Sequence, residues 1–331
     1  MTQFNRFGIM GMGAWGTALA IAIHRAGSEV RIWGRRPDIA STLSGGQGNE
    51  VYLPDIAIPA LQADTDVSIL GDVDAVLAVV PAQHMRDTLA AVASTLPPGI
   101  PVLLCAKGIE RQSLKLMTHV LRETLPDAIP AVLSGPSFAH DVAQGLPTAI
   151  TLASSDEDLG HALIHAIGQP AFRPYWTSDL IGAEIGGAVK NVLAIACGIV
   201  EGMELGRSAH AALLSRGFAE MRRLALVLGA QETTLSGLSG LGDLVLTCSS
   251  SQSRNMSFGI ELGRGRSAAH ILAERMTVTE GAATAPAITA LAEANGVEMP
   301  ICNSITAILA GDVTVQQAIA SLLERPFKGE N

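Results

Sequence analysis

Lys190 has the surroundings in this sequence that best suit acid–base chemistry. It lies within residues 180–200, an apolar stretch that predicts a long helix. Burial disfavours the ammonium form, so a desolvated lysine has a pKa nearer neutrality, as a general acid or base requires. The alternative is a lysine at a helix turn that reaches water along its methylene chain. We therefore predict Lys190 as the catalytic residue.

Gly186 and Gly187 lie one helical turn before this lysine. Each glycine inside a helix costs about 1 kcal/mol relative to alanine, so another segment is expected to approach that backbone closely. Asp243 follows the glycine-rich residues 239–242 and has two interpretations. It caps the helix predicted from residue 244, or it is a carboxylate that bonds substrate hydroxyls or tunes Lys190.

Ser253, Arg254 and Asn255 precede a helix predicted from residue 256. A serine cap, exposed backbone amides, an arginine and an asparagine at one helix N-terminus form a candidate phosphate cradle. The alternative is an ordinary helix cap with solvated neighbours.

Two further features lie where predicted strands end, the edge at which open α/β sheets bind ligands. Lys107 follows the strand predicted at 101–106, where its ammonium can meet a phosphate or carbonyl oxygen, or simply extend into water. Gly135 and Pro136 mark a constrained loop close to a ligand, and Ser137 is expected to cap a helix over 138–143.

Gly11, Gly13 and Gly16 fit the G-x-G-x-x-G pattern. The pattern stands between a strand predicted at 6–10 and a helix predicted at 17–26, the context in which it binds a dinucleotide pyrophosphate at a helix N-terminus. A tight strand-to-helix turn without a ligand is the alternative.

Arg35 and Arg36 follow the strand predicted at 29–33, where many NAD-binding folds carry a carboxylate for the ribose hydroxyls. Arginine at this place accepts a 2′-phosphate, so we predict that NADP(H) is preferred and that NAD(H) is possible. A solvated basic turn is the alternative.

The candidate site residues lie in two predicted regions of different architecture. Strands at 75–81, 101–106, 129–133 and 148–152, alternating with helices at 85–96 and 113–125, predict a parallel, doubly wound sheet, while residues 38–64 look like loop and extended chain. After residue 179 the sequence predicts only helices. The expected domains are therefore an α/β Rossmann-type domain at 1–180 and an all-α domain at 181–331, with the boundary in the helix after 179.

Composition limits the possible partners. A net charge of −9 argues against nucleic acid or an anionic membrane as a partner, and no apolar run has the ~20 residues of a membrane span. No secretory signal is evident, and the four cysteines are widely spaced, so we expect a cytoplasmic protein with reduced thiols. His161 and His165 share a helix face without a third ligand, so no metal site is expected.

Seven motifs together resemble bacterial NAD(P)-dependent glycerol-3-phosphate dehydrogenase over nearly the whole chain. They are GMGAWG (11–16), Lys107, SGPSFA (134–139), GGAVKN (186–191), SGLGDLVLTC (239–248), SQSRN (251–255) and TEG (279–281). The resemblance implies that dihydroxyacetone phosphate and sn-glycerol 3-phosphate are interconverted for phospholipid synthesis. It also implies a helical domain like that of 6-phosphogluconate dehydrogenase, and a homodimer is possible.

The resemblance also implies residue roles, with Lys190 as the proton acceptor in oxidation. The implied substrate contacts are Lys107, Gly135, Ser137, Lys190, Asp243, Ser253, Arg254 and Asn255. The implied cofactor contacts are Ala14, Trp15, Arg35, Lys107, Ala139, Arg254, Val278 and Glu280. Ala14 replaces a serine found in many relatives, and Trp15 replaces a tyrosine or phenylalanine.

Two other functions remain as alternatives to this reading. A ketopantoate reductase or β-hydroxyacid dehydrogenase would share the glycine pattern and a helical-domain lysine, but has no need of the 251–255 cradle. A non-catalytic NADP(H)-sensing protein would need neither Lys190 nor Asp243.

Overall fold

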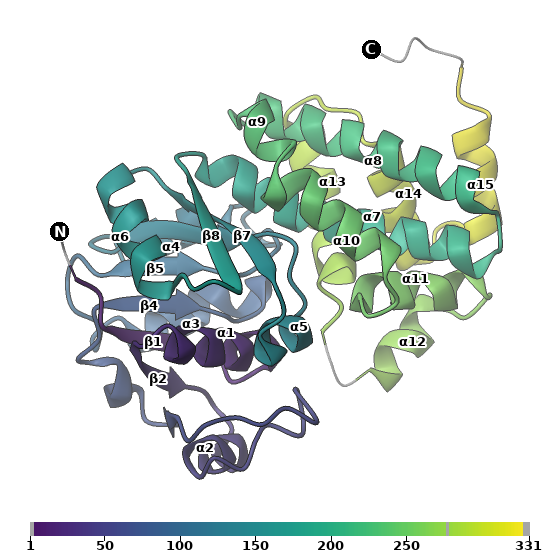
Figure 1. Cartoon of the computed structure of the whole chain (residues 1–331). Helices are drawn as coiled ribbons and strands as arrows, with labels where there is room; N and C mark the ends of the chain where they lie inside the picture. Colours follow the sequence, from purple (N-terminus) through teal and green to yellow (C-terminus); the bar gives the residue numbers. More distant parts are fainter. Residues whose placement is uncertain (1–2, 276–277, 327–331) are drawn as a thin grey trace.

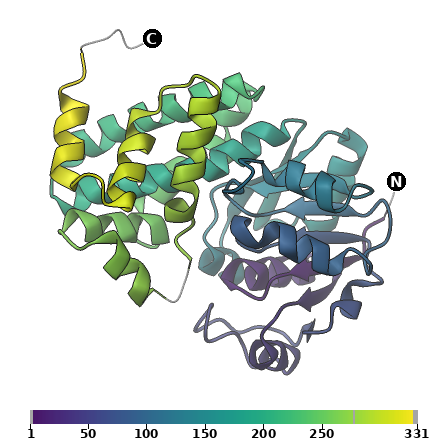
Figure 2. The ribbon, with the colours of Figure 1, turned by 180° about the vertical axis from the view of Figure 1, so that it is seen from behind.

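The computed structural model describes residues 3–275 and 278–326, which form a sheet half and a helical half joined by one long helix (Figure 1). The expected order, an α/β half followed by a helical half, is confirmed. Seen from behind, the two halves lie side by side, and the last helix is on the side of the helical half away from the sheet (Figure 2).

Eight strands form one sheet in the order β3-β2-β1-β4-β5-β6-β7-β8 within the described residues. Their bounds are β1 Arg6–Met10, β2 Glu29–Trp33, β3 Gln62–Asp64, β4 Ala75–Ala78, β5 Pro101–Leu104, β6 Ile129–Ser134, β7 Thr148–Ser154 and β8 Phe172–Thr177. The central strands β4 and β5 are apolar and buried throughout because helices cover both faces of the sheet.

The expectation of a wholly parallel sheet is wrong at one pair, because β7 runs antiparallel to β6. The connection between these strands contains α5 (Ala139–Gln144), a helix of six residues. Such a helix spans about 9 Å, whereas a strand of six or seven residues spans about 20 Å. The chain therefore does not return across the sheet, and β7 starts from the edge at which β6 ends.

Helices cover the two faces of the sheet and separate two apolar cores. One core joins the strands to α1 and α6, and the other joins them to α3 and α4. The helices and 3-10 turns of this half are α1 Ala14–Arg25, α2 Pro37–Ser44, η1 Val67–Leu70, η2 Ala82–His84, α3 Met85–Val92, α4 Met117–Thr124, α5 and α6 Glu157–Ile167.

The helical half is built around α7 (Leu180–Gly202), whose residues 182–200 are all buried. By length and composition α7 could cross a membrane, yet 94% of its most apolar stretch is buried inside the protein. The elements after it are α8 Arg207–Val227, α9 Glu232–Leu235, η3 Leu238–Gly242, α10 Asp243–Ser249, α11 Arg254–Gly263, α12 Ala268–Glu274, α13 Glu280–Ala294, α14 Pro300–Ala310 and α15 Val315–Leu323.

Helices α7 and α11 meet backbone to backbone through glycines. A Cβ on Gly198 would lie 2.2 Å from the carbonyl oxygen of Met256, and a Cβ on Gly259 would lie 2.0 Å from that of Ile195. Gly202 and Gly263 continue the same contact one turn further on. We call these four glycines the glycine seam, and it fixes the spacing between the two helices.

Several predicted bounds are wrong. Residues 38–64 hold α2 and β3, β8 was not predicted, and α1 begins at residue 14 instead of 17. Helix α4 begins at 117, because residues 111–113 form a turn and residues 114–116 have no regular structure. The strand predicted at 75–81 ends at residue 78, and the helix predicted at 85–96 ends at residue 92.

Candidate active site

A cleft of about 710 Å³ lies where the carboxyl ends of the first strands face the helical half. It brings together most residues that the sequence singled out. The cleft is lined by Gly11, Gly13, Ala14, Trp15, Gly16, Arg35, Arg36, Lys107, Ser137, Ala139, Lys190, Ser253, Arg254, Asn255, Val278 and Glu280, among others. Gly135 and Asp243 lie directly behind this lining, bonded to Lys107.

The glycine turn has the geometry that its spacing predicts. Gly11 has a φ of 123°, which favours glycine, and its N–H donates to the carbonyl of Trp33 at 2.8 Å. A Cβ on Gly16 would lie 2.0 Å from the carbonyl oxygen of Gly11, so only glycine lets α1 pack so tightly on the turn. A Cβ on Gly13 would meet nothing within 4 Å. The turn thus offers open space beside a helix N-terminus, which fits a pyrophosphate.

Arg35 and Arg36 have different surroundings although they are neighbours. The Arg36 guanidinium pairs with Asp38, with Nε 3.0 Å from Oδ1, and lies 6.0 Å from the ring centre of Tyr52. This pairing raises the pKa of Arg36 further. Arg35 is exposed and has no side-chain hydrogen bond or ion pair within the described part of the chain. Arg35 is therefore the arginine available to a ligand.

A buried carboxylate joins the two lysines. Lys190 Nζ donates to Asp243 Oδ1 at 2.7 Å, and Lys107 Nζ donates to Asp243 Oδ2 at 2.8 Å. Lys107 also donates to the carbonyl of Gly135 at 3.0 Å. Asp243 is the first residue of α10 and the N-cap position belongs to Gly242, so the expectation that Asp243 caps this helix is wrong. We call Lys107, Asp243 and Lys190 the charge cluster.

Lys190 is 5% exposed, and burial lowers its pKa to about 8. The carboxylate of Asp243 opposes this shift because it favours the charged ammonium, whereas Lys107 adds to it. The solvated alternative for this lysine is thus wrong. A lysine with a pKa near neutrality can hold or release a proton under physiological conditions.

Sequence reasoning missed Thr247, whose Oγ1 accepts from Lys190 Nζ at 2.7 Å. The signal was available, because Asp243 and Thr247 are four residues apart and so share one face of α10. The close approach expected at the α7 glycines is confirmed, since a Cβ on Gly186 would lie 2.4 Å from the carbonyl oxygen of Ser239.

The three residues of the expected phosphate cradle have different surroundings. Ser253 is the N-cap of α11, and its Oγ accepts from Met256 N at 3.2 Å. Arg254 is exposed on the cleft wall. Asn255 is buried, and its side-chain amide donates to Asn191 Oδ1 and accepts from Gly281 N, both at 2.9 Å.

The turn after β6 carries Gly135 and Ser137. Gly135 has a φ of 150°, and a Cβ there would lie 3.1 Å from Ile150 Cα, which explains the glycine. Ser137 Oγ donates to the carbonyl of Gly135 at 3.1 Å, and Phe138 occupies the N-cap of α5. The expected capping role of Ser137 is therefore wrong, and its hydroxyl turns back toward the loop.

The remaining cofactor candidates lie around the cleft. Ala14 begins α1, Ala139 begins α5, and Val278 is exposed at the cleft wall. Trp15 has a buried indole N–H with no hydrogen-bond partner in the described residues. Glu280 Oε1 accepts from Ala82 N at 3.4 Å across the two halves, and burial raises the pKa of this carboxyl.

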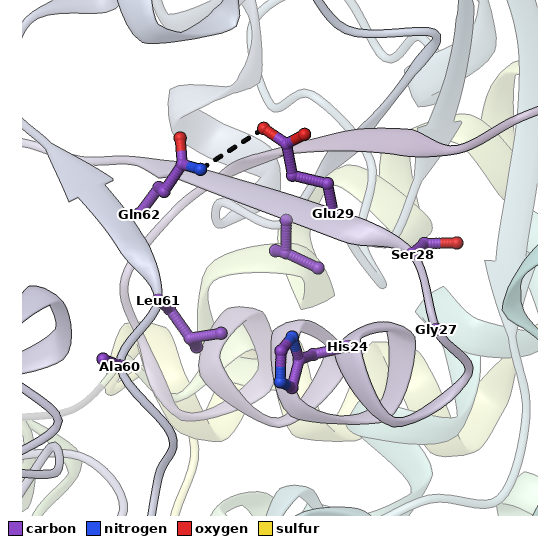
Figure 3. Close-up of a pocket in the computed structure, with 8 residues that line it drawn as sticks. His24, Gly27, Ser28, Glu29, Ala60, Leu61 and Gln62 are labelled. Carbon is purple, nitrogen blue, oxygen red and sulfur yellow. Dashed lines mark hydrogen bonds between the residues drawn. The ribbon is translucent and has the colours of Figure 1, made fainter.

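A smaller pocket of about 410 Å³ lies at the opposite, amino-terminal end of β2 (Figure 3). His24, Leu61 and Gln62 line it, and Gln62 donates to Glu29 at 3.3 Å. None of the predicted site residues is there. The described residues also contain no group of three or more His, Cys, Asp or Glu side chains placed to hold a metal ion.

A glycine turn at the carboxyl ends of a Rossmann-type sheet, facing a buried lysine in a helical half, defines the class of NAD(P)-dependent dehydrogenases. Comparison with known families gives the particular member. Residues 6–160 match the N-terminal model of NAD-dependent glycerol-3-phosphate dehydrogenase, and residues 179–320 match its C-terminal model. The chain belongs to this family, as the seven motifs predicted.

Individual relatives match this chain over nearly its whole length. The chain is 60% identical over 328 residues to glycerol-3-phosphate dehydrogenase (NAD(P)+) of Maricaulis maris, covering 99% of this chain and 98% of the relative. It is 56% identical over 332 residues to that of Hyphomonas neptunium, covering 100% and 99%. The crystal structure of the glycerol-3-phosphate dehydrogenase from Coxiella burnetii matches with a TM-score of 0.93 at 38% identity, covering 97% and 99%.

Proposed function

We propose that this protein catalyses the reversible, NAD(P)H-dependent reduction of dihydroxyacetone phosphate to sn-glycerol 3-phosphate. The observation that carries the proposal is the ammonium of Lys190, buried at the cleft between Asp243 and Thr247 with a pKa of about 8. Such a group can protonate a ketone oxygen and later accept the proton back from an alcohol.

Lys190 is the general acid in reduction and the general base in oxidation. When bound, the nicotinamide supplies the hydride. Asp243 holds the ammonium of Lys190 in place and keeps its charge, and Thr247 fixes its direction. Lys107, tied to the same carboxylate, presents a second cation for the carbonyl oxygen or phosphate of the substrate.

The substrate phosphate is assigned to the N-terminus of α11. Arg254 supplies an exposed guanidinium there, and Ser253 and Asn255 hold the first turn of the helix in place. Gly135 and Ser137 form the opposite wall of the substrate pocket, next to Lys107. These roles match the contacts that the motif resemblance implies.

The cofactor is assigned to the glycine turn, with the pyrophosphate over Gly11, Gly13 and Gly16. Arg35, which is exposed and unpaired in the described residues, favours NADP(H), while NAD(H) is also used. The further cofactor contacts are Ala14, Trp15, Arg36, Lys107, Ala139, Arg254, Val278 and Glu280.

The cellular setting follows from this activity. The product supplies the glycerol phosphate backbone of phospholipids, and the enzyme acts in the cytoplasm on small molecules, without nucleic acid or membrane insertion. We place the domain boundary at residues 180/181, where α7 begins.

An assay of NADPH and NADH oxidation tests the function. Dihydroxyacetone phosphate is expected to be reduced with both cofactors, and at lower concentrations of NADPH than of NADH. Ketopantoate and another non-phosphorylated keto acid serve as comparison substrates. Faster turnover of either one would overturn the assignment in favour of a related reductase, and tight NADPH binding without turnover of any ketone would indicate a sensing protein.

A further inference from the structure

Asn49 is a buried polar residue in a glycine-rich stretch, residues 45–49, to which the sequence assigned no function. It is 1% exposed although Gln47 and Glu50 beside it are exposed. Its backbone carbonyl accepts the N–H groups of Tyr52 at 3.2 Å and Leu53 at 2.7 Å, which closes a tight turn. This turn directs the asparagine side chain inward, toward the start of α1.

The side-chain amide of Asn49 donates two hydrogen bonds, one to the glycine turn and one to α1. Nδ2 lies 3.0 Å from the carbonyl oxygen of Met12 and 2.8 Å from Oγ1 of Thr17. Met12 is the residue before Gly13, and Thr17 lies in the first turn of α1. One amide therefore bridges the turn and the helix that follows it.

The hydrogen bond to the Met12 carbonyl also fixes the N–H group of the next residue, Gly13. A trans peptide is planar, so the N–H of Gly13 points the opposite way from that carbonyl. Gly13 lines the cleft, and its missing Cβ leaves open space there. The bond from Asn49 thus sets the direction of an N–H group at the place where a pyrophosphate fits.

The side-chain carbonyl oxygen of Asn49 indicates why an asparagine is present at this position. Asn49 Oδ1 is buried and has no hydrogen-bond partner in the described residues. An unpaired buried acceptor destabilises a fold, and an apolar side chain of similar size would avoid this cost. The donated bonds are then the reason for a polar residue at this position.

We propose that Asn49 is a positioning residue for the dinucleotide, which acts by holding the glycine turn in its binding conformation. The inference rests on the proposed cofactor site. Because NADPH and NADH share the pyrophosphate, Asn49 contributes equally to the binding of both. It differs in this from Arg35, whose contribution depends on the 2′-phosphate.

The test uses Asn49→Ala and Asn49→Asp, with dissociation constants for NADPH and NADH measured by titration calorimetry. Aspartate keeps the size of asparagine but replaces the donating amide with an acceptor. Both variants are expected to bind both cofactors about tenfold more weakly, with an unchanged ratio between the two. In steady-state assays the KM for cofactor is expected to rise, while kcat at saturating cofactor falls much less.

Thr17 and a surface asparagine provide the controls. Thr17→Val is expected to weaken both cofactors in the same way and Thr17→Ser to restore them, while combining Thr17→Val with Asn49→Ala gives less than the sum of the two losses. Asn295→Ala removes an exposed asparagine that also donates to a backbone carbonyl, and it leaves cofactor binding unchanged.

Cofactor binding at wild-type strength in Asn49→Asp or Thr17→Val would overturn the inference, as would a loss confined to kcat. Arg35→Asp separates this failure from failure of the site itself. If Arg35→Asp weakens NADPH while Asn49→Asp does not, only the positioning role is wrong. If neither substitution changes cofactor binding, the cofactor does not lie on the glycine turn. If Asn49 variants do not fold, the Thr17 variants decide.

Discussion

The two sides of the cleft present their binding groups in different ways. On the sheet side, the glycine turn offers backbone N–H groups and open space, and its residues are close together in sequence. Facing it, the charge cluster joins the buried Lys190 and Asp243 of the helical half to the partly buried Lys107 of the sheet half, and its bonds join residues 136 and 53 positions apart. One surface depends on local conformation, and the other depends on the packing of the whole chain.

This difference separates the part of the protein that binds the cofactor from the part that carries the acid–base chemistry. A backbone cradle needs no buried charge, so it suits a cofactor that enters and leaves. A buried lysine needs a carboxylate partner to keep its charge, and here that partner comes from another helix. Acid–base chemistry therefore depends on the packing of α10 on α7 within the helical half, whereas pyrophosphate binding depends mainly on the sheet half.

The strongest test of this division is Lys190→Met. Removal of the general acid is expected to lower kcat by about 10²–10⁴-fold, because proton transfer to the ketone oxygen loses its donor. The dissociation constant for NADPH should change little, since the glycine turn is untouched. Rapid kinetics and cofactor titration measure the two effects. Lys115→Met, at a partly exposed lysine outside the cleft, is the control, and near-normal turnover of Lys190→Met would rule out the role.

Asp243→Asn tests the link within the charge cluster. For reduction Lys190 must be protonated, so the rate is expected to fall as pH rises through about 8. Asp243 raises the pKa of Lys190, so its neutralisation moves this fall to lower pH, by about one unit or more. A pH profile of kcat checks this shift. An unchanged profile would show that the carboxylate does not tune the lysine. Asp312→Asn, at an exposed aspartate, is the control.

Arg35→Asp and Arg36→Asp test the sheet side. Arg35→Asp is expected to weaken NADPH about 10- to 100-fold and NADH far less, since only NADPH carries the 2′-phosphate. Arg36 is held by Asp38, so its substitution should alter the NADPH-to-NADH ratio less. Cofactor titrations of both variants give the ratio. Equal losses of both cofactors in Arg35→Asp would contradict the selectivity assignment.

Glu184→Gln tests the contact between the halves and is expected to change turnover least. Glu184 on α7 accepts from Thr118 N and Oγ1 at 2.9 and 2.7 Å, and burial raises its pKa to about 7 from 4.5. The folded state therefore binds an extra proton between these values, and stability falls as pH rises through them.

Glutamine at position 184 carries no charge, so the stability of the variant does not fall with rising pH for this reason. Relative to wild type, its free energy of unfolding should increase by about 1–3 kcal/mol between pH 5 and pH 8. Urea unfolding at both values measures this, with Glu293→Gln as an exposed control. A constant difference between the two proteins would show that Glu184 is ionised throughout.

Prediction from sequence succeeded where information is local. The glycine turn, β1 and β2 were placed from residues close together in the chain. It failed at the antiparallel β7, where the short length of α5 was not taken into account, and at the edge strand β8 and the helix in the 38–64 stretch, which depend on packing against the rest of the sheet half. The sequence left two roles open for Asp243, a cap of α10 or a partner of Lys190. The structure decides between them, because Gly242 occupies the N-cap position and Asp243 bonds to Lys190.

The glycine seam restricts how this enzyme can change over time. Lys190 and the N-terminus of α11 lie on two helices whose backbones touch, and any side chain at Gly198 or Gly259 would push them apart. Small, successive substitutions therefore cannot widen the substrate pocket by moving these helices. New specificities in this lineage, whether natural or engineered, must arise from the side chains on the cleft walls while the spacing of α7 and α11 is inherited unchanged.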